Sequence, residues 1–344
     1  MTGSGSKPSV SKPSVSKPGG GEQSGAGNSS GAEGDSVLAR SLEGWQPGPV
    51  TMTRRVDPWM AEAFAGLIGS PVPGVKDGEP LPPMWHWFTL LEHAATSEIG
   101  ADGHPANGHF LPPVPGRRRM FAGGRLTLDA PIPFGADVTA TSSLASVTIK
   151  QGRSGEMAFV TVRHELSVSA AAGGTAGGTA GGTIVGTEEQ DIVYRSEPEG
   201  TPPRVMSRTE SEEPEPVGDW KLSLPTDPVL LARFSALTYN GHRIHYDKPY
   251  VTEAEGYPDL VIHGPLLALL ALELPRLHAP DRTVTRFAYR LVRPAFVPSR
   301  IIAVGSPGEG AADSTGGGAA PGTATLTVAA AGAAPSLTAQ ATLG

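Results

Sequence analysis

The chain has 344 residues, no cysteine and a formal net charge of −7. The absence of cysteine excludes disulfides, thiolate zinc sites, iron–sulfur clusters and cysteine nucleophiles, and the negative charge argues against a nucleic-acid partner. No apolar run reaches the roughly 20 residues that cross a bilayer. Because no hydrophobic segment follows the lysines near the N-terminus, we expect no secretory signal, no membrane contact and a cytoplasmic location.

Three segments of low complexity interrupt the chain. Residues 1–36, which repeat Ser-Lys-Pro and then become rich in glycine and serine, are predicted to be a disordered tail because they contain too little apolar surface to offset the entropy of folding. Residues 171–183 repeat Ala-Gly-Gly-Thr, and residues 305–322 are rich in glycine and alanine. Each of these two lies between strand-like runs and is predicted to be an enlarged loop.

The predicted domains are 37–195 and 217–344, joined by a linker at 196–216 that is rich in proline and glutamate. In the first half, Met84–Ala95 has the apolar spacing of a helix and follows two prolines, which remove no hydrogen bond from a first helical turn. Alternating apolar and polar residues predict antiparallel strands after it. These strands are Arg125–Leu128, Asp137–Ile149, Met157–Val168 and Ile192–Arg195.

The second half repeats this order of elements. Gly264–Leu277 has leucines on nearly every face, so a helix here must be surrounded by other elements. The strands predicted after it are Val284–Val292, Ile301–Val304, Thr323–Ala329 and Ser336–Leu343. One buried helix followed by an antiparallel meander indicates a sheet wrapped around a helix. Two such units in tandem predict an α+β fold with a central helix in each half.

The densest group of polar side chains lies between residues 234 and 264 and runs directly into the leucine-rich helix. Its members are Tyr239, Asn240, His242, His245, Asp247 and His263. The first N–H groups of a helix lack partners and lie at the positive end of the helix dipole, so the N–H of Gly264 is a natural donor to a carbonyl that develops negative charge. A nearby imidazole can transfer a proton at neutral pH.

This stretch resembles the hydratase-2 signature of the MaoC-like enoyl-thioester hydratases, which have the hot-dog fold. In that family an Asp and a His, five residues apart, activate one water, and a His-Gly pair opens the central helix. If the family's His is His245, its Asp falls on Asn240, so this sequence departs from the general pattern at one of two catalytic positions.

The sequence NGHRIHYD…EGYPDLVIHGPL is more similar to one branch of the family, the mesaconyl-CoA (3-methylfumaryl-CoA) hydratases and the type-2 hydroxyacyl-thioester dehydratases, where Asn is usual. LPPMWHWF, DGHPANGHFLPPVPGRRRMFAGG and IKQGRSGEMAFVTVRHE in the first half also resemble this branch. The likeness covers approximately Trp59–Arg293. It implies a tandem hot-dog fold and reversible addition of water to a 2-enoyl-CoA, without metal or other cofactor.

The resemblance also implies roles for the polar residues. An amide does not accept a proton near pH 7, so Asn240 is expected to orient water or substrate. His245 is the preferred general base and acid, with His242 as the competing candidate. The thioester oxygen would lie near Gly264, whereas His263 either acts there directly or only fixes the loop before the helix.

Weaker candidates lie outside the signature. Arg118 and Arg119 either pair with coenzyme A phosphates or form a solvated turn. Tyr239 and Trp85 are candidates for substrate contact, with a core position as the alternative for Trp85. A zinc site built from the three histidines and Asp247 is disfavoured because such spacing is common by chance.

Three functions remain open from the sequence. The first is a hydratase of a short, dicarboxylic, mesaconyl-like enoyl-CoA, and the second is a (3R)-hydroxyacyl-thioester dehydratase of fatty-acid or polyketide metabolism. The third is an inactive acyl-thioester-binding protein. The first half is expected to shape the acyl pocket and the coenzyme entrance, and either a monomer or a homodimer is compatible with a doubled fold.

Overall fold

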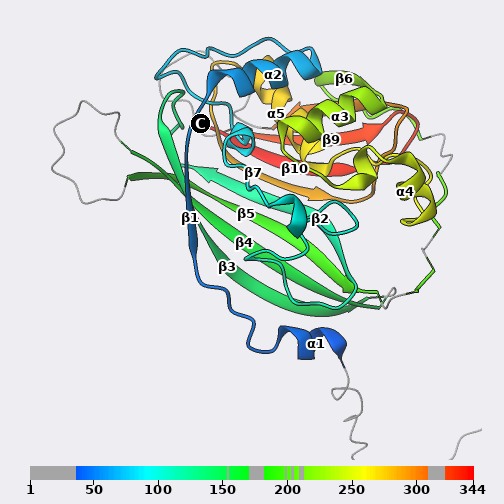
Figure 1. Cartoon of the computed structure of the whole chain (residues 1–344). Helices are drawn as coiled ribbons and strands as arrows, with labels where there is room; N and C mark the ends of the chain where they lie inside the picture. The colour runs from blue at the N-terminus through cyan, green and yellow to red at the C-terminus, as the bar shows by residue number, and fades with distance from the viewer. Residues whose placement is uncertain are drawn as a thin grey trace, which may run out of the picture. The chain divides into compact units, whose positions relative to one another are not determined.

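A single antiparallel sheet of ten strands carries both halves of the chain in the computed structural model (Figure 1). The structure describes residues 36–152, 155–169, 182–197, 200–202, 205–208, 213–308 and 322–344. The strands of the first half are β1 Val50–Arg55, β2 Arg117–Leu128, β3 Asp137–Gly152, β4 Gly155–Val168 and β5 Thr183–Ser196. Those of the second half are β6 Trp220–Thr226, β7 Val284–Leu291, β8 Ser299–Pro307, β9 Gly322–Ala330 and β10 Leu337–Leu343.

The strand order of the second half mirrors that of the first. The sheet runs β1-β3-β4-β5-β2-β7-β10-β9-β8-β6, so that each half has the same internal order and the two meet where β2 pairs with β7. The predicted strands are all present, and most are longer than the sequence indicated. This doubled sheet confirms the predicted tandem α+β architecture, and residues Val37–Gly344 form one compact unit.

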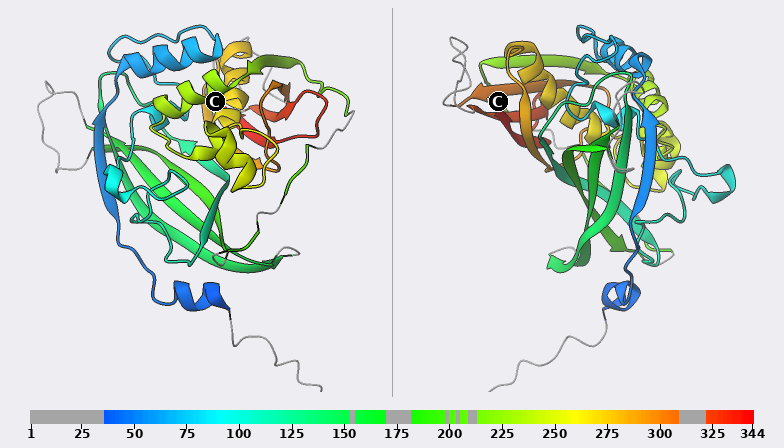
Figure 2. Two further views of the ribbon diagram at one scale, coloured as in Figure 1. Left: turned by 45° about the vertical axis from the view of Figure 1, so that its right-hand side comes forward. Right: turned by 90° about the vertical axis from the view of Figure 1, so that its left-hand side faces the viewer.

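The helices are also related between the halves. Helix α2 (Pro58–Ile68) follows β1 as α3 (Pro228–Leu237) follows β6. Each begins with an Asp-Pro pair, in which the side chain of Asp57 or Asp227 accepts a backbone N–H of the first turn. The two helices contact each other on the side of the sheet that also holds α5 (Figure 2). The remaining helices are α1 (Val37–Leu42) and α4 (Lys248–Glu253), with 3-10 turns η1 (Trp85–Phe88), η2 (Thr96–Glu98) and η3 (Arg243–His245).

Helix α5 (Gly264–His278) is the buried helix that the leucine pattern predicts. Every residue from Leu266 to Pro275 is buried, and the helix packs against strands β6 to β10. Its one buried acid, Glu273, accepts hydrogen bonds from Arg276 and from Ser70 after α2, which satisfies the charge. In the described part of the chain, no helix has both the length and the apolar character needed to span a membrane.

The predicted helix Met84–Ala95 is wrong, and only the single turn η1 forms there. Met84 has a left-handed φ of 70°, which a continuous helix does not allow. His86 and Trp87 both bind the buried carboxylate of Glu188 on β5, so tertiary contacts override the helical pattern. The first half therefore has no counterpart of α5 among its described residues.

The low-complexity segments lie mainly outside the described residues. This holds for 1–35 of the predicted tail, for 170–181 and for 309–321. The strands next to the two internal segments pair with each other, β4 with β5 and β8 with β9, as expected for enlarged loops between neighbours. The predicted linker 196–216 starts at the last residue of β5 and precedes β6, and its role as a linker stays a prediction.

Candidate active site

The loop between α3 and α4 forms the centre of the candidate site. Tyr239 adopts a left-handed φ of 51° directly after α3 and turns the chain back. The side-chain oxygen of Asn240 accepts the backbone N–H of His242 at 2.9 Å, which stabilises the turn in the manner of an Asx turn. The short η3 then places His245 inside the protein, where its side chain is 6% exposed.

His245 has the protonation state and orientation of a general base. Its Nδ1 lies 2.7 Å from the carbonyl oxygen of Val261, which only accepts, so Nδ1 carries the proton and Nε2 keeps its lone pair. Burial lowers the pKa of His245 to about 4, although the bond to Val261 opposes this, and the charge of His104 lowers it further. The ring is therefore neutral at pH 7.

The ring of His263 lies directly against that of His245. His263 precedes α5, is completely buried and has Nε2 within 2.9 Å of the hydroxyl of Ser235, whereas Nδ1 finds no hydrogen-bond partner among the residues that the structure describes. Its ring stacks on that of His245 with centroids 3.6 Å apart. Burial, together with the neighbouring His245 and His242, holds the pKa of His263 well below its ordinary value. Two neutral imidazoles therefore lie face to face at the start of α5.

The first turn of α5 offers unpaired donors next to these rings. Neither Gly264 nor Leu266 donates its N–H to an acceptor in the described residues, and Pro265 between them has none. A Cβ atom on Gly264 would lie 2.5 Å from Leu291 of β7 and 3.5 Å from Phe121 of β2. Gly264 thus packs closely against the seam between the two halves of the sheet, where a larger residue would not fit, and the free N–H groups of this first turn are potential donors to an anionic oxygen.

A loop from the first half reaches the same place. The ring of His104 lies 3.9 Å from that of His242, which in turn lies 5.5 Å from that of His245. Asp102 accepts the backbone N–H of His104 at 3.0 Å and approaches its Nδ1 at 3.2 Å. Sequence reasoning missed both residues, and the only signal was their place in DGHPANGHF, a motif shared with the resembling branch.

Burial controls the charge of this outer pair of rings. Burial lowers the pKa of His104, although Asp102 opposes this shift. Burial also lowers the pKa of His242 strongly, and the nearby positive charges of two histidines and two arginines lower it further: His104, His245, Arg119 and Arg118. For Asp102, burial acts to raise the pKa, but the hydrogen bonds from His104 outweigh it and the pKa is lowered. The site therefore contains neutral imidazoles and one ionised carboxylate at pH 7.

The two loops are joined through their backbones. The N–H of Arg243 donates to the carbonyl of Asp102 at 2.8 Å, and its guanidinium donates to the carbonyl of Ala101. Gly103 has a φ of 87°, and a Cβ there would lie 1.9 Å from the carbonyl oxygen of Gly241. Only glycine fits this contact, which fixes the first-half loop against the second-half loop.

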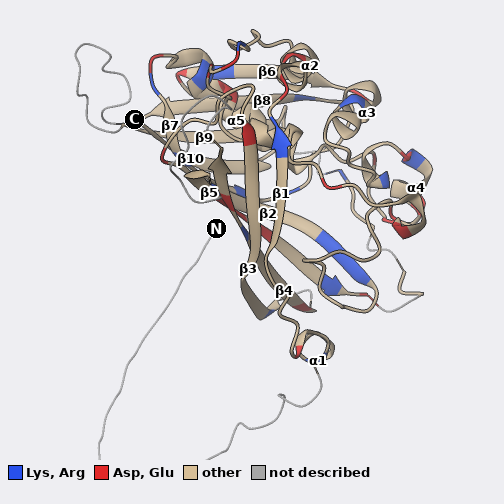
Figure 3. Ribbon diagram, turned by 60° about the vertical axis from the view of Figure 1, so that its left-hand side comes forward, with Lys and Arg blue, Asp and Glu red and all other residues tan. Residues whose placement is uncertain are grey.

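The weaker sequence candidates lie in three different environments. Tyr239 is 64% exposed, and Trp85 is 1% exposed in the core, where its ring contacts those of Phe64 and Phe88. Arg118 and Arg119 belong to the basic stretch at the start of β2 (Figure 3).

These two arginines have different partners. Arg118 forms ion pairs with Glu197 and Glu255 at 3.3 and 3.1 Å. Arg119 is half-buried near His104 and His242, and no carboxylate among the described residues forms an ion pair with it. Arg119 also lies beside the hydroxyl of Tyr194 on β5, so it is a cation at the site whose charge no carboxylate of the described residues neutralises.

The zinc combination considered from the sequence does not assemble. Asp247 pairs with Arg243 at 2.7 Å and caps α4, so it is turned away from the histidines. The donor atoms that do lie close together, within 4.8 Å of one another, belong to Asp102, His104 and His242.

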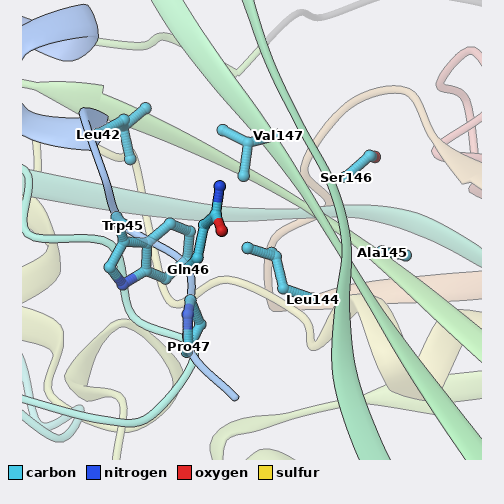
Figure 4. A pocket seen from close by; sticks show the side chains of 8 residues that line it. All are labelled: Leu42, Trp45, Gln46, Pro47, Leu144, Ala145, Ser146 and Val147. Atoms are coloured by element: carbon cyan, nitrogen blue, oxygen red, sulfur yellow. The ribbon is translucent and has the colours of Figure 1, made fainter. Parts of the chain in front are cut away.

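A separate cavity of about 560 Å³ opens between the segment after α1 and β3 (Figure 4). It is lined by Leu42, Trp45, Gln46, Pro47 and Leu144–Val147, where the pairing of β3 with β4 shifts by one residue. None of the imidazoles or arginines described above lines it, so this cavity does not belong to the candidate active site.

Comparison with known sequences is consistent with this geometry. Residues 84–297 match the family described as hydroxyacyl-thioester dehydratase type 2. A mesaconyl-C(4)-CoA hydratase of Chloroflexus aurantiacus is 43% identical over 246 residues, which cover 71% of this chain and 81% of that protein. A mitochondrial hydroxyacyl-thioester dehydratase type 2 of Schizosaccharomyces pombe is 38% identical over 118 residues, 33% of this chain and 37% of that protein.

Solved structures of low sequence identity show the same fold. A MaoC-like dehydratase from Phytophthora capsici aligns with a TM-score of 0.56 at 13% identity, covering 89% of this chain and 98% of that one. A Mycobacterium tuberculosis protein described as having a double hotdog fold aligns with a TM-score of 0.53 at 12% identity, covering 87% and 96%. The predicted tandem hot-dog fold is thus confirmed.

Proposed function

The chain belongs to the hydroxyacyl-thioester dehydratase type 2 family, and on that premise we propose that it reversibly adds water to the 2,3 double bond of an enoyl-CoA. The membership confirms the family expected from the motifs. The observation that carries the proposal is the neutral His245, with a free Nε2, beside the unpaired N–H groups of α5. A base next to an oxyanion donor is the pair that conjugate addition of water requires.

The reaction follows from these positions. The thioester carbonyl accepts the N–H of Gly264, so that negative charge can develop on its oxygen. His245 Nε2 takes a proton from water as the water oxygen bonds to C3 of the acyl chain, and C2 then receives that proton. Dehydration is the reverse. His263 supports the ring of His245 from below, and Asn240 shapes the loop, since its oxygen already accepts the N–H of His242.

His242 remains the second candidate for the base. Its ring is closer to the first-half loop than that of His245 and lacks the bond to a backbone carbonyl that fixes the tautomer of His245. We therefore assign the proton transfer to His245.

A short dicarboxylic substrate is the preferred acyl group. The chain is 43% identical to a mesaconyl-C(4)-CoA hydratase, and Arg119 offers a half-buried cation near the reacting centre for a second carboxylate. Arg118 is less suited to this role because it is already paired with two glutamates. An Arg–carboxylate contact in a partly buried site discriminates strongly between charged and neutral acyl chains.

The test is a panel of crotonyl-, mesaconyl-, itaconyl- and decenoyl-CoA, followed by the loss of absorbance of the conjugated thioester. We expect the highest kcat/KM with a dicarboxylic ester, and we expect Arg119→Gln to lower it at least tenfold more for mesaconyl-CoA than for crotonyl-CoA, with Arg119→Lys between. Preference for decenoyl-CoA would instead indicate fatty-acyl or polyketide dehydration. Binding of every ester without turnover would indicate an inactive binding protein.

The proposal includes the properties that the sequence led us to expect. The enzyme needs no metal or redox cofactor, because the thioester itself activates the double bond, and it acts in the cytoplasm as a monomer or homodimer. Full activity after dialysis against EDTA, cell fractionation and sedimentation test these three points separately.

A further inference from the structure

Asp102 is the carboxylate that faces the row of imidazoles. The family's aspartate position is occupied by Asn240, which carries no charge. The other acids near the loop have partners of their own: Asp247 binds Arg243, Asp259 binds Lys248 and Glu255 binds Arg118. In contrast, a carboxylate oxygen of Asp102 lies within 4.8 Å of ring nitrogens of both His104 and His242.

We propose that Asp102, acting through His104, positions His242 and supplies from the first half the negative charge that the family's aspartate provides at position 240. This proposal rests on the proposed hydratase activity. Asp102 and His104 are positioning residues, since neither is required to touch the substrate. The groups follow one another in a row from carboxylate to base. An oxygen of Asp102 lies 3.2 Å from Nδ1 of His104, and the ring centroids lie 3.9 Å apart for His104 and His242 and 5.5 Å apart for His242 and His245.

This row of side chains has an electrostatic role in the proposed reaction. When His245 takes a proton from water, an imidazolium forms in a buried place that already contains the charges of Arg118 and Arg119 near His242. A carboxylate close to the row stabilises that transient charge, and it does so without gaining or losing a proton itself. The proton moves only from water to Nε2 of His245 and from there to C2.

The geometry explains why the carboxylate can come from another part of the chain. The carbonyl of Asp102 accepts the N–H of Arg243, and Gly103 lies against Gly241 with no room for a side chain. These contacts hold the two loops in one relative position. Asp102 is therefore fixed relative to His242 as firmly as an acid on the same loop as His242 would be.

The same three donor atoms do not favour a resident metal ion. Asp102 and His104 already hydrogen-bond to each other, and Arg118 and Arg119 place positive charge beside His242. A divalent cation would have to break the hydrogen bond between Asp102 and His104, and it would be repelled by the two guanidinium groups near His242.

The decisive experiment compares Asp102→Asn and His104→Gln with the control Glu98→Gln. Glu98 is an exposed acid earlier in the same segment, and among the described residues its side chain accepts the backbone N–H of Ala95 alone. We expect Asp102→Asn and His104→Gln to lower kcat at least tenfold while the Kd for the hydroxyacyl-CoA product and the Tm stay within error. Asp102→Glu should recover part of kcat, and Glu98→Gln should behave as wild type. The pH profile of kcat should change only in the variants at 102 and 104.

Two results would overturn the proposal. One is wild-type kcat and pH dependence in Asp102→Asn. The other is a loss of activity that merely follows the folded fraction in both variants. If the wild-type protein hydrates none of the esters, the proposed function fails instead. The coupling is then tested on its own by NMR titration, in which Asp102→Asn should lower the pKa of His104 and shift the ring signals of His242.

Discussion

The imidazole of His263 lies flat against that of His245, with ring centroids 3.6 Å apart and ring planes inclined by 17°. His263 is completely buried at the start of α5, so it fixes one face of the His245 ring, while the carbonyl of Val261 fixes its edge. A ring held at a face and an edge has little freedom to rotate. The Nε2 atom of His245 is therefore pre-oriented before substrate binds, as an efficient general base requires.

Replacing His245 by Ala should reduce kcat about 100-fold or more, because proton transfer by a positioned base contributes at least that factor. The assay is the loss of enoyl-thioester absorbance, and circular dichroism should show an unchanged fold. His93→Ala is the matched control, since His93 is an exposed histidine. Full activity of the His245 variant would reassign the base, with His242 as the next residue to test.

Stability should fall as the pH is lowered from about 6.5 to about 4. The unfolded chain protonates His245 near its ordinary pKa of 6.5, whereas burial lowers the pKa in the folded protein to about 4. The unfolded state therefore binds more protons in this window, which decreases the free energy of unfolding by about 3 kcal/mol. The free energy of unfolding, measured with urea at several pH values, should depend less steeply on pH in His245→Gln than in wild type.

Substituting Gly103 by Ala should separate the two loops of the site. The added Cβ meets the carbonyl oxygen of Gly241 at 1.9 Å, a backbone atom that cannot move aside alone. We expect kcat to fall at least tenfold, with faster hydrogen exchange in residues 100–110. Gly78→Ala is a control of equal backbone strain, because Gly78 has a φ of 91° but nothing within 4 Å of the new Cβ. Equal effects of both variants would refute the role of the contact.

Removing His86 should destabilise the first half. Glu188 is 2% exposed and accepts hydrogen bonds from His86, Trp87 and Gln190. His86→Ala leaves a buried carboxylate without its main partner, at a cost of about 3–5 kcal/mol in urea unfolding. The neighbouring Glu189 pairs with exposed arginines, so Glu189→Gln should cost about 1 kcal/mol or less.

The buried carboxylate of Glu188 should also make the stability of the protein depend on pH in the acid range. Burial acts to raise the pKa of Glu188, but the charge of His86 outweighs it and lowers the pKa to about 2. The stability that this pair contributes is therefore complete above pH 4.5 and is lost as the pH falls toward 2. Glu188→Gln should remove this part of the pH dependence, and an unchanged acid transition would contradict the assignment.

The sequence predicted α5 but failed at Met84–Ala95, although both segments have apolar residues at helical spacing. In α5 the leucines lie all round and the sheet surrounds them, so pattern and packing agree. At Trp85 and its neighbours, the deciding contact is with Glu188, whose strand comes far later in the chain. Local periodicity contains no information about such a partner.

The candidate site was predictable to the extent that it lies on one segment. His242, His245, His263 and Gly264 follow one another closely in the sequence and come together in the structure. Asp102 and His104 reach the same place only because β2 pairs with β7 and the two loops bind through their backbones. The long-range pairing of the halves, which no single motif encodes, was needed to find them.

The mirrored strand order has a consequence for stoichiometry. A chain built from two equal repeats would have two helix starts and hence two places for a thioester, but the described residues of the first half contain only the turn η1 where the second half has α5. Under the proposed function, the described residues thus form one catalytic centre, to which the first half contributes the loop of Asp102 and His104. Titration with a tight-binding thioester analogue should accordingly saturate at one equivalent per polypeptide, whatever the number of copies in the assembly.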